Sequence, residues 1–411
     1  MKVVIVCRSH TEGGAAIVSH RLMKALRNAG HDARMLVLSS ASEDCIDNYS
    51  KGWRTKVDFL AERLQIFTHN GFSRSRLFMV DTASWGADIS RHPWVQEADV
   101  INLNWINQGA LSLRAIERLA AMGKRLVWTM HDMWNCTGIC HHAYDCRRYE
   151  QQCGNCPYLG FMAWQHDLSY ATLLRKRHLY DNSHIKFVAV SRWLADCCLR
   201  SSLMGKADIS IIPNAFPIEE FSYAPVDASE VGIPYGKKVL IMGAARLDDA
   251  VKGFPRLIAV TKYMAENMPE LAEKCHLLLF GGLRNEALLE QLALPYTYLG
   301  KVPMQRITRL YAMSNVVIST SHRESLGGTL VEGIACGCLA VTFSKGGQVD
   351  VVDHLETGYL AQNDDIADFV KGIDWAVNSA KVSREALNRA MSRRFSSETV
   401  AKKYISLFED K

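Results

Sequence analysis

The sequence predicts an α/β protein made of two doubly wound, Rossmann-like domains. The first observation is length, because 411 residues exceed what one ordinary hydrophobic core supports. The second is that short apolar runs alternate with helical segments in both halves of the chain, a pattern typical of parallel sheets covered on both faces. The third is a polar, proline-containing stretch between the two halves.

The first half opens on a β-branched strand over residues 3–6 and continues through Gly13-Gly14 into a helix that reaches about Asn28. Further strands are predicted over 33–38, 99–105, 124–132 and 185–191. Polar residues follow or end several of these strands: His10, Asn104, His131 and Ser191. Because ligands bind at the carboxyl edge of open α/β sheets, we expect a site at this edge.

The second half begins after a predicted linker that runs from Pro213 to about Gly236. Its strands are predicted over 238–245, 276–282, 297–300, 315–320, 339–343 and 358–360. A last helix, from about Glu398 to Phe408, has apolar residues at helical spacing and so packs against another element. These boundaries predict domains over 1–215 and 216–385 that face each other across a cleft, with residues 386–411 crossing back to the first domain.

The composition excludes several classes of protein. A hydrophobic share of 48% with 22% charged residues is that of a soluble globular protein. No apolar run approaches the roughly 20 residues of a membrane span, and the start resembles a buried strand more than a signal peptide, so we expect a cytoplasmic protein. The net charge of +5 is mild and the basic runs lack interleaved aromatics, which argues against nucleic-acid binding and suits an anionic small substrate or membrane surface.

The strongest motif joins Glu324 and Glu332. Glu324 follows a predicted strand and Glu332 lies in the first two turns of the next helix, so both carboxylates can point toward one ligand. The residues between them offer backbone N–H groups at a helix N-terminus, where an anionic phosphate is stabilised: Ser325, Leu326, Gly327, Gly328 and Thr329. One carboxylate would take ribose hydroxyls and the other would take hydroxyls of a sugar. The alternative is two surface glutamates on an ordinary amphipathic helix.

This segment resembles the E-x7-E signature of retaining GT-B glycosyltransferases of family 4. The resemblance covers nearly the whole chain, and the matching motifs are the Gly13-Gly14 loop, the strand ending in His131, Pro213-Asn214, Gly243-x-x-Arg246 with Lys252-Gly253, and Gly346-Gly347. It implies a GT-B fold and a glycosyltransferase of the hexosyltransferase type. It also implies that a nucleotide-diphosphate sugar binds the C-terminal domain, and that a saccharide or lipid-linked acceptor binds the N-terminal domain.

The resemblance also implies roles in the donor site of the second half. Glu332 is expected to bind the ribose, and Glu324 the donor sugar and its developing positive charge. Arg246 and Lys252 match the cations that hold the diphosphate, and fixed cations there would lower the barrier as the leaving group gains charge. The chain has no Asp-x-Asp motif, so we expect catalysis without a metal cofactor. The alternative is two exposed basic residues in a turn.

Two elements of the first half complete the expected site. The family's equivalent of His131 contacts the donor sugar, whereas a single histidine at the end of a strand is more often structural. Gly13-Gly14 resembles the loop whose backbone approaches the donor phosphate and the acceptor, although here it follows Thr11-Glu12, which departs from the usual pattern. The alternative for these glycines is a plain turn into a helix.

A cysteine-rich insertion spans residues 136–157. Four thiolates suffice for a closed tetrahedral Zn²⁺ site with a structural role: Cys140, Cys146, Cys153 and Cys156. His141 or Cys136 could replace one of them, and the alternative is reduced cysteines packed in a loop. The insertion resembles one found in a subset of family 4 enzymes of exopolysaccharide and capsule pathways, which implies bacterial surface polysaccharide biosynthesis.

A second helical pattern precedes the site region. Apolar residues at positions 53, 57, 60, 64 and 67 repeat at helical spacing, with Arg54, Lys56 and Arg63 nearby. Such a helix could lie on the cytoplasmic face of the inner membrane and meet a lipid-linked acceptor. We favour the commoner explanation, in which the stripe packs on its own domain.

Two rival functions remain open from the sequence. One is a nucleotide-sugar 2-epimerase of GT-B fold, which acts without an acceptor. The other is an inactive partner subunit that only binds a sugar nucleotide, against which the intact Glu324, Glu332, Arg246 and Lys252 argue.

Overall fold

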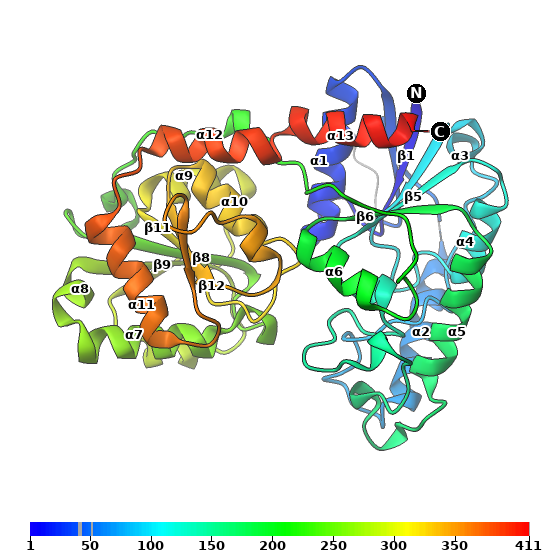
Figure 1. Cartoon of the computed structure of the whole chain (residues 1–411), viewed down its shortest axis with the longest axis horizontal. Coiled ribbons are helices and arrows are strands. Elements are labelled where there is room, and N and C mark those ends of the chain that lie inside the picture. Colours follow the sequence, from blue (N-terminus) through cyan, green and yellow to red (C-terminus); the bar gives the residue numbers. More distant parts are fainter. Residues whose placement is uncertain (40–42, 51, 411) are drawn as a thin grey trace. The chain divides into compact units, whose positions relative to one another are not determined.

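The computed structural model describes residues 1–39, 43–50 and 52–410. The chain forms two compact units (Figure 1). The first comprises Met1–Ala215 together with the chain from Val400 onward, and the second comprises Phe216–Thr399.

The first unit contains a seven-stranded parallel sheet with the strand order β3-β2-β1-β4-β5-β6-β7. Its strands are β1 (Lys2–Val6), β2 (Asp32–Val37), β3 (Ile46–Asn48), β4 (Val100–Leu103), β5 (Arg125–Met130), β6 (Ile185–Ala189) and β7 (Ile209–Ile211). Its helices before the linker are α1 (Gly14–Asn28), α2 (Trp53–His69), α3 (Pro93–Glu97), α4 (Leu113–Ala120), α5 (Leu168–Asp181) and α6 (Arg192–Arg200). The five predicted strands are confirmed. The edge strands β3 and β7 were not predicted, because three residues each are too short for a recognisable apolar run.

The second unit contains a six-stranded sheet with the order β10-β9-β8-β11-β12-β13, again parallel throughout. Its strands are β8 (Lys238–Arg246), β9 (Cys275–Gly282), β10 (Tyr296–Tyr298), β11 (Val316–Ser319), β12 (Leu339–Phe343) and β13 (Gly358–Ala361). Its helices are α7 (Phe254–Asn267), α8 (Pro269–Lys274), α9 (Met304–Met313), α10 (Gly328–Ala335), α11 (Ile366–Asp374) and α12 (Arg384–Phe395). All six predicted strands are present.

Most of the stretch predicted as a linker, from Phe216 onward, belongs to the second unit. Phe216 and Ile218 are fully buried, and the Phe216 N–H donates to the Phe395 carbonyl at 2.9 Å at the end of α12. The polar residues of this stretch made its few buried apolar side chains hard to recognise in the sequence.

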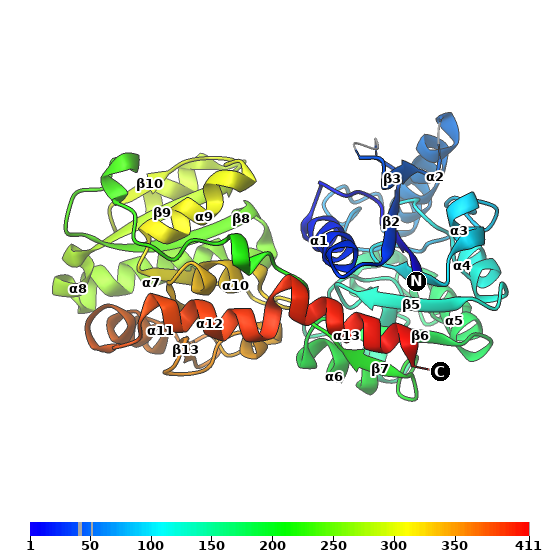
Figure 2. The same cartoon turned by 90° about the horizontal axis from the view of Figure 1, so that it is seen from above.

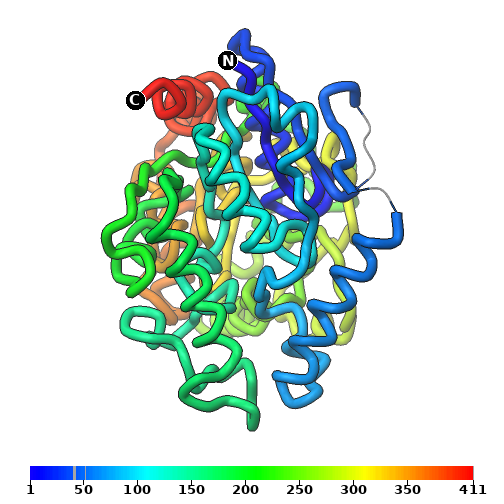
Figure 3. Tube along the Cα trace, turned by 90° about the vertical axis from the view of Figure 1, so that its right-hand side faces the viewer, coloured from blue at the N-terminus to red at the C-terminus, as the bar shows by residue number. Residues whose placement is uncertain are grey.

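The final helix, α13 (Ser397–Glu409), packs its C-terminal part into the first unit. Val400, Tyr404 and Phe408 share a hydrophobic core with Val3 and other residues of β1 and α1. Figure 2 shows the C-terminal part of α13 beside the elements of this unit. The Tyr404 hydroxyl lies 3.0 Å from Thr129 Oγ1 on β5. The first strand and the last helix therefore lie close together in one unit (Figure 3).

Helix α2 packs in the opposite sense to the one we favoured from the sequence. Its apolar stripe is exposed at Trp53, Val57, Leu60 and Leu64. The residues of α2 that are buried are Glu62, Arg63 and Ile66. The interpretation of this stripe as a face packed on its own domain is therefore wrong.

Candidate active site

In the second unit, Lys252 and Glu324 form an ion pair at the carboxyl edge of the sheet. Lys252 follows β8 and Glu324 follows β11, and these central strands are parallel neighbours. Lys252 Nζ lies 2.6 Å from Glu324 Oε1, which also accepts a hydrogen bond from Ser321 Oγ at 2.8 Å. The two side chains are 29% and 19% exposed, so a ligand in solvent can reach both. The structure thus brings together two predicted site residues that are 72 positions apart.

The loop that carries Lys252 is fastened to the end of β11. Thr320 Oγ1 donates to the carbonyls of Lys252 and Gly253, both at 3.1 Å. Gly253 has φ 68°, and a Cβ at this position would lie 2.1 Å from the Thr320 carbonyl oxygen. Only glycine fits this approach, which explains why Lys252 is followed by glycine immediately before α7.

The Gly346-Gly347 turn supports the loop before α10 from behind. The Gly347 N–H donates to the Glu324 carbonyl at 2.7 Å, and a Cβ on Gly347 would lie 2.1 Å from the Ser325 carbonyl oxygen. Next to this turn, the buried Gln348 Oε1 accepts hydrogen bonds from Ser319 Oγ at 2.6 Å and Thr342 Oγ1 at 2.7 Å. These contacts hold the Glu324 loop against β11 and β12.

Helix α10 begins where the sequence predicts a phosphate-binding N-terminus. Gly327 is its N-cap residue with φ 97°, and no side chain of the described residues caps the helix there. The first-turn N–H groups of Gly328 and Thr329 have no partner within the helix and are the ones that an anion would take. Glu332 lies further along the helix and is half-buried, while Leu326 is buried.

Arg246, at the end of β8, is held by acidic residues of its own loop. Its guanidinium lies 3.2 Å from Asp248 Oδ1 and 3.3 Å from Asp249 Oδ2. The side chain is 40% exposed. Arg246 is therefore a partly neutralised, accessible cation at the same sheet edge as Lys252.

In the first unit, His131 follows β5 and its Nε2 lies 2.9 Å from Asn104 Oδ1, just beyond β4. Asn104 Nδ2 donates to the Asn102 carbonyl at 3.2 Å, which orients the amide with its oxygen toward His131. Nε2 therefore carries the proton and Nδ1 keeps its lone pair. Burial lowers the pKa of His131 to about 4, although the negative charge of Asp132 acts to raise it. The imidazole is therefore neutral near pH 7.

Asp132, which the sequence reasoning did not select, links His131 to the cysteine-rich insertion. Its Oδ2 accepts hydrogen bonds from His141 Nδ1 at 2.8 Å and Trp105 Nε1 at 3.2 Å, and its Oδ1 accepts one from the Trp134 N–H at 2.8 Å. Burial alone would raise the pKa of Asp132, but the charge and hydrogen bond of His141, the charge of His142 and the Trp134 N–H lower it to about 2. The signal available in the sequence was only the position next to His131.

The remaining polar residues at this edge have mixed roles. Gly13 is the N-cap residue of α1 and Gly14 is its first residue, and no described atom lies within 4 Å of where a Cβ would stand on either. Their backbone is therefore open to a ligand. Ser191 instead caps α6, because its Oγ accepts the Leu194 N–H at 3.1 Å.

Four cysteines of the insertion line one cavity: Cys140, Cys146, Cys153 and Cys156. All four are thiols. The two alternative ligands have other partners, because Cys136 Sγ lies 3.2 Å from the Met133 carbonyl and His141 binds Asp132. Among the residues that the structure describes, no three His, Cys, Asp or Glu side chains are arranged to hold a metal ion. The structure gathers the four predicted thiols but does not set them in ligand geometry.

Comparison with known families identifies the class of protein. The description "Glycosyltransferase Family 4" matches residues 12–220, which is more than half of the 411 residues. The description "Glycosyl transferases group 1" matches residues 230–393. The chain belongs to glycosyltransferase family 4.

The match with each curated relative covers only part of that relative's length. N-acetyl-alpha-D-glucosaminyl L-malate synthase of Bacillus anthracis is 28% identical over 194 residues, 44% of this chain and 48% of that protein. The GPI3 subunit of phosphatidylinositol N-acetylglucosaminyltransferase from Saccharomyces cerevisiae is 26% identical over 113 residues, 27% of this chain and 25% of that protein. The chain thus spans about half or less of these curated relatives.

Solved structures share the fold over the whole chain. HepE of Anabaena, in complex with UDP and glucose, has a TM-score of 0.66 at 16% identity and covers 100% of both chains. Sucrose-phosphate synthase of Thermosynechococcus elongatus has a TM-score of 0.67 at 17% identity, over 99% of this chain and 98% of that chain. These similarities confirm the predicted fold class, with two Rossmann-like domains of the GT-B type.

Proposed function

We propose that the protein is a retaining, metal-independent glycosyltransferase that moves a hexosyl group from a nucleotide-diphosphate sugar to a saccharide acceptor. The observation that carries this proposal is the Lys252–Glu324 pair, 2.6 Å apart, beside the uncapped N-terminus of α10. A cation, a carboxylate and the first amides of a helix at one sheet edge are what a diphosphate and its sugar require.

In the proposed reaction, the bond between the anomeric carbon and the diphosphate oxygen breaks and its electron pair leaves with the nucleotide. Lys252, Arg246 and the amides of Gly328 and Thr329 neutralise the charge that develops there. Glu324 faces the positive charge that develops on the sugar. The acceptor oxygen bonds to the same face of the anomeric carbon, and its proton passes to the departing diphosphate.

His131 would serve as a neutral hydrogen-bond partner. Its Nδ1 lone pair can accept a hydrogen bond from a hydroxyl of the donor sugar, while Asn104 holds Nε2. Because burial lowers its pKa to about 4, His131 is a weak base near neutral pH, which does not suit proton abstraction from an acceptor. Glu332 would bind the ribose, and the Gly13-Gly14 backbone would approach the donor phosphate and the acceptor.

We further propose a lipid-linked saccharide as acceptor and bacterial surface polysaccharide synthesis, at the cytoplasmic face of the inner membrane, as the setting. The support is the resemblance of the cysteine-rich insertion to that of capsule and exopolysaccharide enzymes. UDP-sugars are the first donors to test, because HepE was solved with UDP and glucose. A 2-epimerase would convert the donor without acceptor, so product analysis with and without acceptor separates the two functions.

The site is tested by two substitutions with different expected effects. Glu332→Gln should weaken donor binding in calorimetry, and unchanged affinity would exclude the ribose role. Lys252→Met should lower nucleotide release by about 100-fold or more, as expected when a charge-stabilising group is removed. Lys262→Met, at an exposed lysine of α7, is the matched control. Near-normal turnover of the Lys252 variant would refute the assignment of the diphosphate cation.

A structural zinc ion in the cysteine cavity is a separate proposal. The four thiols that line it form a donor set of the kind that zinc takes. Elemental analysis of the purified chain should show about one zinc per molecule, and replacing Cys153 and Cys156 with serine should abolish it. Metal-free wild-type protein with an unchanged melting temperature would contradict this proposal. Brief EDTA treatment should spare catalysis, because no proposed step uses the metal.

A further inference from the structure

Helix α2 presents its apolar face to solvent. Trp53, Val57, Leu60 and Leu64 are 71%, 46%, 61% and 63% exposed. Their spacing of four, three and four residues places them on one side of the helix. Scattered apolar residues on a surface need no explanation, whereas a contiguous stripe of large side chains marks an interaction surface.

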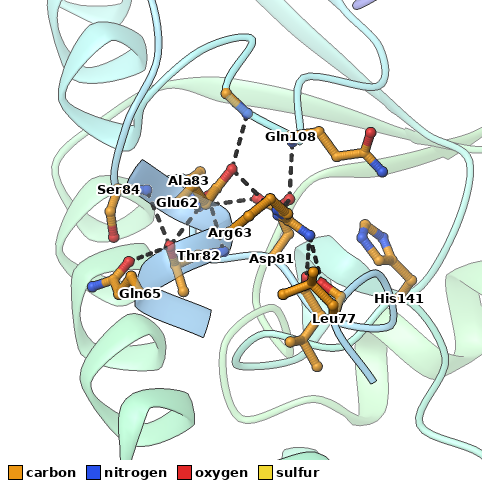
Figure 4. Close-up of polar contacts among 12 residues, drawn as sticks. Glu62, Arg63, Gln65, Leu77, Asp81, Thr82, Ala83, Ser84, Gln108 and His141 are labelled. Atoms are coloured by element: carbon orange, nitrogen blue, oxygen red, sulfur yellow. Dashed lines mark hydrogen bonds and ion pairs between the residues drawn. The ribbon is translucent and has the colours of Figure 1, made fainter. Parts of the chain in front are cut away.

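The inward face of α2 carries charged side chains that make polar contacts with the residues around them (Figure 4). Arg63 Nη2 lies 2.6 Å from Asp81 Oδ2, and Arg63 Nη1 donates to the Leu77 carbonyl at 2.7 Å. Glu62 Oε2 accepts the Gly109 N–H at 2.9 Å. Glu62 and Asp81 are completely buried. Rotating α2 to bury its leucines would turn Arg63 away from Asp81. The buried Asp81 carboxylate would then lack its cation, so the apolar stripe must face outward.

Neighbouring loops extend the apolar stripe into a surface. Further large side chains are exposed beside α2, in the loop after it and around the 3₁₀ turn at Pro157–Met162: Phe72, Phe78, Phe161, Met162 and Trp164. The Phe72 ring contacts Phe67, the next apolar residue of the stripe, at 5.4 Å between centroids, and the Phe78 ring stacks at 6.4 Å on Phe59, which lies toward the buried face of α2. Phe161 packs on Gly71, since a Cβ there would lie 2.5 Å from its ring. These segments lie at the same end of the first unit (Figures 1 and 3).

We call this set the α2 apolar surface. It consists of the exposed side chains of Trp53, Val57, Leu60, Leu64, Phe72, Phe78, Phe161, Met162 and Trp164. Exposed cations accompany it at Arg54, Lys56 and Arg74. Between residues 53 and 79 the acidic residues are Asp58 and the buried Glu62. The surface therefore combines a large apolar area with an excess of positive charge.

We infer that the α2 apolar surface docks the first unit on an anionic lipid membrane. Leucine and phenylalanine side chains would enter the acyl boundary, tryptophans would lie at the headgroup level, and the cations would face lipid phosphates. A second copy of the chain fits less well, because a two-fold contact would bring together two surfaces that both carry an excess of positive charge. The inference deepens the proposed membrane setting but depends on this surface alone.

Vesicle co-sedimentation without donor or acceptor tests the inference. The full-length chain should bind vesicles of phosphatidylcholine with phosphatidylglycerol, and bind vesicles of phosphatidylcholine alone more weakly. Leu60→Asp with Leu64→Asp should reduce binding by about tenfold or more, because two buried leucines are lost from the bilayer. Leu199→Asp replaces an exposed leucine of α6 in the same unit and should leave binding unchanged. Circular dichroism and thermal melting verify that each variant is folded.

The cations have their own test. Arg54→Gln with Lys56→Gln should remove most of the difference between anionic and neutral vesicles and flatten the salt dependence. Lys262→Gln with Lys371→Gln, at exposed lysines of the second unit, is the matched control.

Two results would overturn the inference. One is wild-type protein that binds neither kind of vesicle. The other is self-association of the wild type in sedimentation velocity that the Leu60 and Leu64 substitutions abolish while vesicle binding stays unchanged. Neither result bears on sugar transfer to a soluble acceptor, so failure of this inference and failure of the proposed reaction are distinguishable.

Discussion

Helices α2 and α10 carry apolar residues at helical spacing, yet they bury opposite kinds of side chain. Helix α10 buries Leu330, Val331 and Ile334 and leaves Glu332 half-exposed at the candidate donor site. Helix α2 buries Glu62 and Arg63 and exposes its leucines. The comparison teaches that periodicity identifies a helix and its two faces, whereas the partner decides which face is buried.

The partners of the two helices explain the difference. Helix α10 lies against β11 so closely that a Cβ on Gly333 would come 2.7 Å from the Val317 side chain, and such contact admits only apolar neighbours. Helix α2 lies over polar groups. Arg63 donates hydrogen bonds to a backbone carbonyl and to Asp81, and Glu62 accepts one from a backbone N–H.

Replacing Arg63 with methionine should lower the free energy of unfolding by about 3–5 kcal/mol, because the buried Asp81 carboxylate would be left without its cation. Urea denaturation of the full chain measures this change. Arg54→Met, on the exposed side of the same helix, is the control and should change stability by less than about 0.5 kcal/mol. Equal effects of the two substitutions would refute the assignment of α2's inward face.

A matched pair of leucines contrasts the two helices directly. Leu330→Ala on α10 should cost about 2–5 kcal/mol, because the side chain is fully buried. Leu64→Ala on α2 should change the free energy of unfolding by less than about 0.5 kcal/mol, because 63% of Leu64 is already exposed. Denaturant titrations in the absence of lipid provide both values, and a large cost at Leu64 would show that α2 is covered in solution.

Glu62 should make stability depend on pH. Burial, followed by the charge of Asp81, raises the pKa of Glu62 to about 8, from an ordinary value of 4.5. Between these values the folded chain holds a proton that the unfolded chain releases, so this group lowers the free energy of unfolding by up to about 1.4 kcal/mol per pH unit as pH rises. Below pH 4.5 the effect is absent, and above pH 8 it is complete.

The Glu62→Gln variant isolates this contribution. It removes the titrating group, so the stability difference between variant and wild type should grow in favour of the variant from pH 5 to pH 8. Glu266→Gln, at an exposed glutamate of α7, should show no such trend. Parallel pH profiles for the wild type and the Glu62 variant would rule out the proposed titration.

Parts of the candidate site could be predicted because their motifs are local. Gly327, Gly346 and Gly347 stand where a positive φ or the closeness of other backbone favours glycine, and Glu324 lies a few residues before the α10 N-terminus. The Asp132–His141 pair could not be predicted, because its two residues belong to different segments with no shared pattern. Gln348 was missed for the same reason, since Ser319 contacts it from 29 residues away.

The sequence by itself determined the two Rossmann-like domains, the positions of their major strands along the chain and the loops that carry Lys252 and Glu324. Apolar runs and glycines act on their immediate neighbours, so their consequences can be read locally. Only the tertiary structure decided that α2 turns its charges inward. The groups that satisfy those charges, Asp81 and the Gly109 N–H, lie 18 and 47 residues further along the chain and become neighbours only when the chain is folded.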